Sequence, residues 1–381
     1  MASANGIGGL ESLDFPVGIA GLERALRALR EYTLALYAGL PDRFWTPSTF
    51  PQLPIVNPPL WELAHIAWFA EFFCLRWRPN DVDGVQTPCM LAGGDELFNS
   101  ARVPHASRWA NEYPSRADCF DYMERSLAAV LAALEVSSHE QRYFFQLALA
   151  HEAMHAEALA MTLNTIGLPM PGCLPQRMRL TGQRQALPLP GGMLRMGASD
   201  RVFHFDNEMP VMQVNVPPFE IDSRVVSETE FSAFASSAAY RQDEFWSEAG
   251  RVWRQSAPEW VGERDDFAAM HVSFYEAEAW CRWAGRRLPD EAEWEFAATH
   301  SNAFADSAGH VWEWTTSPFT GYPGFVAGPY RDYSAPWFES HMVLRGGSFA
   351  TLPWLRYPQY RNFYMPHRRD VFCGFRSCAL A

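Results

Sequence analysis

A proline-rich stretch at residues 169–190 divides the chain of 381 residues into two halves of different character. Before it, apolar residues recur at helical spacing over long segments. After it, Gly, Pro, Trp and Asn recur every few residues and the strand-like pieces are short. Each half is long enough to bury a core of its own. The sequence therefore predicts an α+β protein of two domains, at 1–172 and 190–381, joined by a linker at 173–189.

The first half is expected to form a four-helix bundle. Apolar periodicity and breaker residues predict helices at 18–39, 59–77, 116–135 and 138–166. The irregular segment 79–114 is long for a simple connection, and loops of this kind are often functional or cover a site. Four helices with one long crossover suggest a bundle whose metal site lies between facing helices. In the second half only two helices are expected, from Ser227 onward and at 275–284.

The last helix of the predicted bundle carries two histidines four residues apart. Residues at this spacing share a helix face, so His151 and His155 point the same way and could both bind a divalent transition metal. His65, on the second predicted helix, is the best candidate for a third ligand. Taken alone, each histidine is more often a structural residue. With Glu157 close by on the same helix, we prefer a metal site to this alternative.

Composition narrows the classes of function. The net charge of −13 argues against sequence-independent binding to nucleic acid or to an anionic membrane. No apolar run approaches membrane-spanning length, and the N-terminus lacks the pattern of a signal peptide. The seven cysteines are scattered without a C-x-x-C pair, which indicates reduced thiols. We therefore expect a cytoplasmic protein that acts on small molecules.

A series of motifs follows in the second half. They are GGMLRMG at 191–197, FDNEMP at 205–210, HVSFYEA at 271–277, RLPDEAEWE at 287–295, GHVWEWT at 309–315 and LRGGSF at 344–349. In this order they resemble the domain of formylglycine-generating enzymes, a variant of the C-type lectin fold with little regular structure. Those enzymes need two cysteines five residues apart soon after the last motif. Residues 350–360 contain none, and Cys373 and Cys378 lie too far along, so the resemblance implies a domain reused without thiol chemistry.

A helical bundle with three dispersed histidines, fused to such a domain, resembles the ergothioneine sulfoxide synthases and the related selenoneine synthases, and the bundle itself resembles the DinB family. The resemblance covers nearly the whole chain, including Leu97–Ser100 in the long loop. It implies a nonheme Fe(II) enzyme that uses O₂ to form a C–Se or C–S bond at imidazole C2 of hercynine. His65, His151 and His155 would be its iron ligands.

The resemblance also implies substrate contacts. Asn362 matches a position that helps to hold the methylated amino group of hercynine, and Tyr360, Phe363 and Tyr364 could offer aromatic faces to this cation. The alternative is that these aromatic residues belong to the core. Arg361, Arg368 and Arg369 are candidates for binding a carboxylate.

Other residues are candidates for assisting the metal chemistry. By resemblance a tyrosine near the iron donates a proton or an electron, and Tyr322 is our choice. Glu62, Glu152 and Glu157 lie near the ligands in sequence and could orient imidazole N–H groups, with Glu157 preferred. The alternative for each carboxylate is a solvated helix face.

Three positions depart from the pattern of the ergothioneine branch. Met154 replaces a glutamine that contacts the methylated amino group of hercynine. Ala101 replaces a tyrosine in the long loop, and Tyr364 replaces an acidic residue. All three are substrate contacts, so they favour a selenoneine synthase whose donor is a selenosugar without an amino-acid head group. The alternatives are an ergothioneine sulfoxide synthase using cysteine or γ-glutamylcysteine, a zinc- or nickel-dependent thiol transferase of the DinB type, and a non-catalytic binding module.

Overall fold

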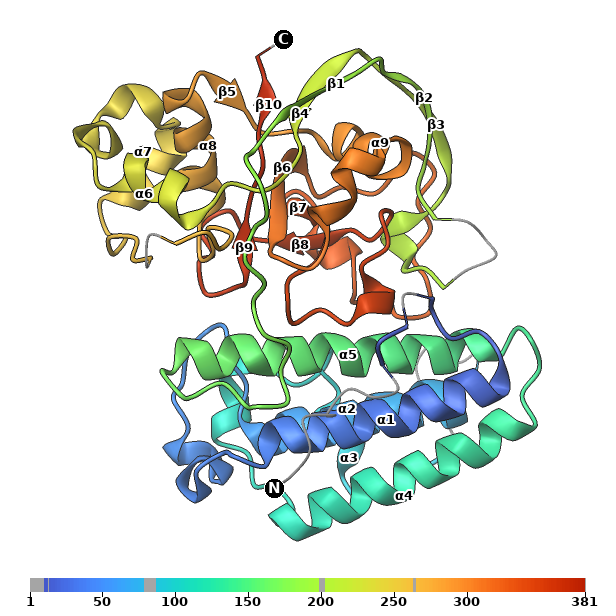
Figure 1. The fold of residues 1–381 in the computed structure, drawn as a ribbon. Helices are drawn as coiled ribbons and strands as arrows, with labels where there is room; N and C mark the ends of the chain where they lie inside the picture. Colours follow the sequence, from blue (N-terminus) through green and yellow to red (C-terminus); the bar gives the residue numbers. More distant parts are fainter. Residues whose placement is uncertain (1–9, 13, 79–86, 199–202, 263–264, 381) are drawn as a thin grey trace. The chain divides into compact units, whose positions relative to one another are not determined.

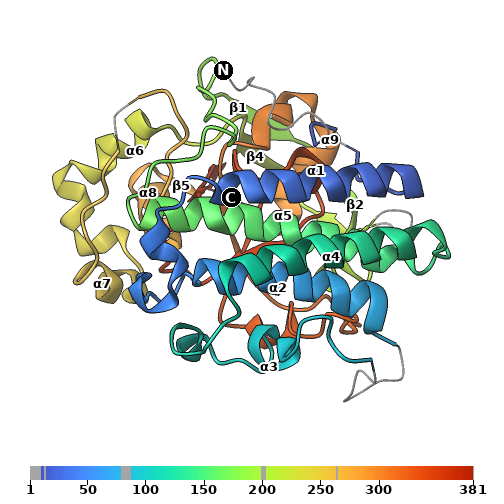
Figure 2. The ribbon, with the colours of Figure 1, turned by 90° about the horizontal axis from the view of Figure 1, so that it is seen from below.

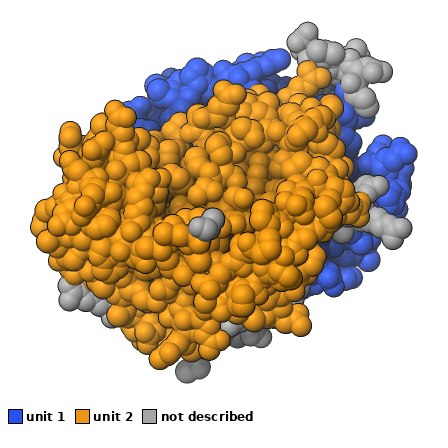
Figure 3. All heavy atoms as spheres, turned by 90° about the horizontal axis from the view of Figure 1, so that it is seen from above, with its two compact units in different colours: residues 1–174, 352–354 blue, residues 175–351, 355–381 orange. Residues whose placement is uncertain are grey.

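The computed structural model describes residues 10–12, 14–78, 87–198, 203–262 and 265–380. The chain forms two compact units, one of residues 1–174 with 352–354 and one of residues 175–351 with 355–381 (Figure 3). The first is helical, and the second combines short strands with helices (Figure 1). The predicted α+β class is confirmed. No helix of the described residues combines the length and apolar character needed to cross a membrane.

In the described part of unit 1, four long helices form a bundle and lie side by side in Figures 1 and 2. They are α1 (Ile19–Tyr37), α2 (Pro59–Glu71), α4 (Arg116–Glu135) and α5 (Arg142–Thr165). Helix α2 contacts both α4 and α5, and α1 contacts the same two helices. Every residue of α2 is buried, which makes this helix the centre of the bundle.

Local signals explain where these helices begin and end. Pro59 occupies the first turn of α2, where its missing N–H costs nothing. Ser115 and Asp118 form a capping box at the start of α4. Past Glu71 the chain continues as a π-helical turn, Phe72–Arg76. The described residues of the crossover from α2 to α4 include a short helix, α3 (Gly94–Phe98), which contacts α2, and a 3₁₀ turn, His105–Trp109.

The described residues of unit 2 form three small sheets. The first sheet has the strand order β1 (Ala186–Leu189), β4 (Phe219–Asp222), β10 (Cys378–Ala379), β5 (Arg286–Arg287). The second sheet pairs β2 (Gly192–Met196) with β3 (Met212–Val216). The third sheet has the order β8 (Asn362–Tyr364), β7 (Met342–Arg345), β6 (Trp312–Pro318), β9 (Cys373–Gly374). All neighbours are antiparallel except β6 and β9. Helix α9 (Glu291–His300) contacts β2, β3, β6 and β7 and so ties two of the sheets together.

The described part of unit 2 contains four helices rather than the two that were expected. α6 (Glu228–Ala235) and α8 (Phe274–Trp283) were predicted, whereas α7 (Glu248–Arg254) and α9 were not. In α9 five consecutive residues from Glu293 to Ala297 are buried, including two glutamates. The sequence of this helix therefore lacks the apolar stripe from which an amphipathic helix is predicted. Its signal was the capping box of Asp290 and Glu293.

Candidate metal centre

The structure brings together the three histidines that the sequence singled out. His65 comes from α2, and His151 and His155 lie one turn apart on α5. One ring nitrogen from each lies within 4.8 Å of the others. The His65 ring centroid is 5.0 Å from that of each partner, and the two α5 rings are 4.4 Å apart. His65 and His151 are buried, and His155 is half-buried, so the cluster has one more accessible side.

The distances and the charge state of these rings suit a divalent transition metal. The Nε2 atoms of His151 and His155 are 3.1 Å apart. Neighbouring ligands of an octahedral ion are about 3 Å apart when each metal–nitrogen distance is about 2.1 Å. Burial, reinforced by the nearby His155, lowers the pKa of His65 to about 3 and that of His151 well below its usual range. Both rings are therefore neutral, which is the form that binds metals.

Hydrogen bonds on the outer ring nitrogens fix which nitrogen faces the cluster. His65 Nδ1 donates to the carbonyl oxygen of Phe98 at 2.8 Å, and His155 Nδ1 contacts Oε1 of Glu62. A carbonyl can only accept, so His65 carries its proton on Nδ1 and keeps the lone pair of Nε2. Histidines that bind metals are usually held in this way, by a carbonyl or a carboxylate on the far nitrogen.

Glu62 is held as an anion beside His155. Burial raises the pKa of this carboxyl, but the charge and the hydrogen bond of His155 outweigh that effect and lower it overall. Glu62 and His155 are separated by 93 positions in the chain and meet because α2 and α5 pack together. An ionised acceptor at this place keeps the proton of His155 on Nδ1 and its Nε2 available.

The other two candidate carboxylates have different surroundings. Glu152 is buried and accepts two hydrogen bonds from Arg30, at 2.8 and 3.0 Å, so the solvated helix face is wrong for this residue. Glu157 is also buried. The nearby Tyr32 hydroxyl has a raised pKa, caused first by its burial and then by the charges of Cys173 and Glu157. Its role in orienting an imidazole stays a prediction.

The predicted contacts for the substrate cation lie in unit 2. Asn362 and Phe363 are half-buried residues of β8; the Asn362 side-chain oxygen accepts the Phe363 N–H at 2.8 Å, and the Phe363 ring stacks on Phe319 at 4.0 Å. Tyr364 lies 5.4 Å from the guanidinium of Arg368. Tyr360 is buried in an aromatic stack with Phe205 and Tyr357, which is the core environment considered as an alternative. In unit 1, Met154 is half-buried on α5.

The three candidate arginines already have partners within the chain. Arg361 is fully buried and binds both carboxylate oxygens of Glu291, at 2.8 and 3.0 Å. Arg368 pairs with Asp370. Arg369 donates to the carbonyl oxygens of His271 and Pro258. A substrate carboxylate would have to compete with these groups.

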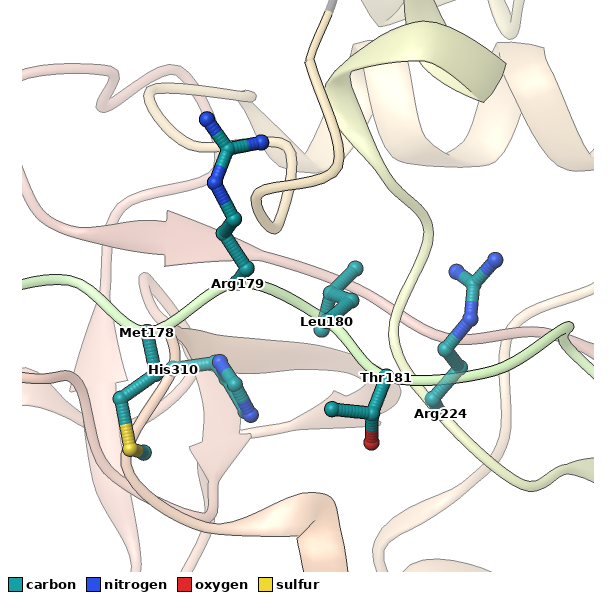
Figure 4. A pocket seen from close by; sticks show the side chains of 6 residues that line it. All are labelled: Met178, Arg179, Leu180, Thr181, Arg224 and His310. Carbon is teal, nitrogen blue, oxygen red and sulfur yellow. The ribbon is translucent and has the colours of Figure 1, made fainter.

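Tyr322 lies in the interior of unit 2, packed with Leu194, Met196, Val216 and Phe296. Its hydroxyl is 3.4 Å from Nη2 of Arg345. Burial raises its pKa above the ordinary value, so the hydroxyl keeps its proton at neutral pH. A pocket elsewhere in unit 2 (Figure 4) is lined by none of the predicted site residues; its lining is Met178, Arg179, Leu180, Thr181, Arg224 and His310.

Sequence reasoning missed the contribution of the crossover loop. The Phe98 carbonyl that binds His65 is a backbone group, which leaves no trace in residue identity. In the sequence, the segment Leu97–Ser100 is marked only by its resemblance to a family pattern. A family motif in a long loop was therefore the one signal that pointed to this contact.

Comparison with known proteins supports the two-part architecture. Residues 25–159 match the DinB superfamily, and residues 174–305 and 300–380 match the sulfatase-modifying factor enzyme 1-like domain. A formylglycine-generating enzyme of Thermomonospora curvata is 35% identical over 159 residues, which are 33% of this chain and 52% of that protein. The fold and the histidine cluster thus define a DinB-type bundle joined to a formylglycine-generating-enzyme-like domain.

Relatives that combine both parts are similar over most of the chain. A hercynine oxygenase of Mycolicibacterium thermoresistibile is 31% identical over 393 residues, covering 85% of this chain and 87% of that protein. A hercynine oxygenase of Mycobacterium tuberculosis is 32% identical, covering 85% and 91%. The chain belongs to the hercynine oxygenase family.

Proposed function

We propose that this protein is a nonheme Fe(II) enzyme that uses O₂ to join selenium or sulfur to imidazole C2 of hercynine. One observation carries the proposal: three imidazoles from two packed helices converge within 4.8 Å in a chain of this family, and burial keeps His65 and His151 neutral. His65, His151 and His155 would hold the iron. Nitrogen ligands of this kind suit several divalent metals, and the family makes iron the expected one.

The residues of the chain then have distinct tasks. A bound Fe(II) would supply redox chemistry with O₂ and open positions for the reactants. Glu62 and the Phe98 carbonyl keep the protons of two ligands on Nδ1. Tyr322, whose raised pKa keeps its hydroxyl protonated, is our proposed proton donor. Asn362, Phe363 and Tyr364 are proposed to bind the trimethylammonium head, and positioning the reactants would be the protein's main contribution.

We propose a selenosugar as the donor. Met154, Ala101 and Tyr364 stand where the ergothioneine branch has side chains suited to its amino-acid substrates. Methionine and alanine cannot pair with an ammonium or a carboxylate, and a tyrosine lacks the charge of an acidic residue. The changes at Ala101 and Tyr364 remove polar partners that an amino-acid donor could use and a selenosugar does not need, whereas Met154 alters a contact to hercynine, which both reactions share.

The decisive experiment is aerobic turnover of the Fe(II)-loaded protein with hercynine and one donor at a time. The donors are cysteine, γ-glutamylcysteine, a thiosugar and a selenosugar, and products are identified by mass. We expect a hercynine–selenium adduct from the selenosugar. An adduct with cysteine or γ-glutamylcysteine would instead assign the ergothioneine reaction. No adduct from any donor, with iron bound, would contradict the proposal.

The same protein loaded with Zn(II) separates the remaining alternatives. A thiol transferase of the DinB type would work with zinc and without O₂, whereas the proposed reaction needs both iron and O₂. A non-catalytic module would bind hercynine without converting it. In that case His151→Ala would lose metal and keep its affinity for hercynine.

A further inference from the structure

The short helix α3 contacts one face of α2 through three ring N–H groups. Trp61, His65 and Trp68 lie at positions i, i+4 and i+7 of α2 and therefore share a face. Trp61 Nε1 donates to the Leu97 carbonyl at 3.0 Å, and Trp68 Nε1 donates to Oδ1 of Asp95 at 2.7 Å. Between them lies the 2.8 Å bond from His65 Nδ1 to the Phe98 carbonyl. His65, a proposed metal ligand, thus makes the middle one of three hydrogen bonds between α2 and α3.

The two tryptophans also hold the plane of the imidazole. The His65 ring stacks on Trp61 with centroids 4.5 Å apart and an interplanar angle of 11°. The Trp68 ring is also nearly parallel to that of His65, with centroids 6.1 Å apart and an interplanar angle of 18°. Turning the imidazole would break the stacking and the carbonyl bond together, so its orientation depends on where α3 sits.

Of the three acceptors on α3, Asp95 is the one that accepts through its side chain. Its carboxylate also links α3 to the turn that follows α2. Besides Trp68, its carboxylate accepts two hydrogen bonds from Arg76, at 2.8 and 3.0 Å. Arg76 in turn pairs with the fully buried Glu71 at 2.8 Å. Burial opposes ionisation of Asp95, but the hydrogen bonds from Arg76 and Trp68 outweigh it and lower its pKa, so the group is an anion at neutral pH.

We propose that Asp95 is a positioning residue for the metal centre. By fixing α3 against Trp68 and Arg76, it holds the Phe98 carbonyl on His65 Nδ1 and so sets the tautomer and tilt that present Nε2 to the metal. Asp95 itself touches neither metal nor substrate. The inference rests on the proposed function, since it requires a metal at the three histidines.

The test compares Asp95→Asn with Asp121→Asn. The first variant points an amide N–H₂ or a weaker acceptor at Arg76, while the second removes an exposed ion pair with Arg125 on α4. Affinity for Fe(II), and for Co(II) as a spectroscopic probe, is measured anaerobically by competition with a chelator. Outer partners of metal-binding histidines typically contribute 10–100-fold in affinity, so we expect Asp95→Asn to bind about 10-fold more weakly or worse. Asp121→Asn should bind like the wild type.

A second measurement reports the hydrogen bond itself. In the protein loaded with diamagnetic Zn(II), the Nδ1–H proton of His65 should give a downfield, slowly exchanging NMR signal. We expect this signal to shift or to exchange faster in Asp95→Asn. Trp68→Phe, which removes one of the three contacts and leaves the pairing of Asp95 with Arg76, should show a smaller effect in the same direction. It also serves if Asp95→Asn does not fold.

Unchanged affinity and an unchanged His65 signal, even with a lower melting temperature, would overturn the inference and reduce Asp95 to a stabilising residue of the loop. The proposed function would survive that result, because the wild type would still bind metal and turn over. Failure of the wild type to bind any metal would instead contradict the proposed function and this inference together.

Discussion

His151 and His155 face each other through their Nε2 atoms, 3.1 Å apart, one turn along α5. Two imidazole nitrogens can share this distance in two ways: one nitrogen donates its proton to the other, or the lone pairs of both bind one cation. The second arrangement needs a further donor, and His65 from α2 supplies it. The three histidines can therefore bind one metal ion together, and for the proposed metal site we expect the pair on α5 to be the least replaceable part.

Removing one of this pair should abolish stoichiometric metal binding. In His151→Ala, the remaining two imidazoles come from different helices and lack the rigid i, i+4 spacing. We expect metal content after Fe(II) loading and gel filtration to fall close to background, as measured by elemental analysis. His139→Ala is the matched control, because His139 is exposed just before α5 and lies outside the cluster. Full metal content in His151→Ala would mean that the ion binds elsewhere.

Replacing Glu62 by glutamine should weaken metal binding more than the same change at Glu157. Glutamine keeps an oxygen for the Nδ1–H of His155 but removes the negative charge that makes this imidazole a better ligand. We expect a loss of about 10-fold in Fe(II) affinity. Glu157→Gln, on α5 itself, should change the affinity less. The opposite order would assign the orienting role to Glu157, the residue favoured by sequence alone.

Helical periodicity was sufficient to find the histidines because His151 and His155 are related within one helix. His65 was found because a third nitrogen ligand was sought on another apolar helix, and the packing of α2 against α5 made the meeting possible. The choice between Glu62 and Glu157 shows the limit of sequence proximity. Glu157 is two residues from the proposed ligand His155 and its role stays a prediction, whereas Glu62 contacts His155 from a distant part of the chain.

The rest of the site could not be predicted because it depends on backbone atoms and on tertiary partners. The Phe98 carbonyl has no residue signature, and the partner of Arg361 is Glu291, from a helix that was not expected at all. Tyr360 was a candidate for cation binding because it lies two residues before Asn362, and the fold places it in an aromatic stack. When aromatic and charged residues are neighbours in the sequence, the sequence alone does not show which of them will be buried in the core.

Gly191, in the first motif of the second half, should tolerate no side chain. Its φ of 66° is left-handed, and a Cβ there would lie 2.2 Å from the Val216 carbonyl oxygen, a backbone atom that cannot move aside cheaply. Gly182 is a matched control: its φ is 68°, and a Cβ added there would have no atom of the described chain within 4 Å. We expect Gly182→Ala to lower the free energy of unfolding by about 1 kcal/mol from backbone strain. Gly191→Ala should cost about 1–3 kcal/mol more. Equal losses in urea unfolding would contradict the close approach.

Glu208 should make unit 2 less stable as the pH rises. It is fully buried, and burial raises its pKa well above the ordinary value, although the Tyr357 hydroxyl donates to both of its oxygens, at 2.9 and 3.0 Å. In the unfolded chain the carboxyl ionises near its ordinary pKa of about 4.3. Above that pH the unfolded state therefore holds fewer protons than the folded state, so the free energy of unfolding falls as the pH rises toward the folded-state pKa.

Glu208→Gln tests this pH dependence because glutamine keeps an oxygen acceptor for Tyr357 and cannot ionise. The wild type should lose up to about 1.4 kcal/mol of unfolding free energy per pH unit through this one group, and the variant should lack that loss. Urea unfolding from about pH 5 to about pH 8 should thus show the variant gaining on the wild type as the pH rises. Parallel curves would show that Glu208 is ionised in the folded protein, with the charges of Arg345 and Arg361 outweighing its burial.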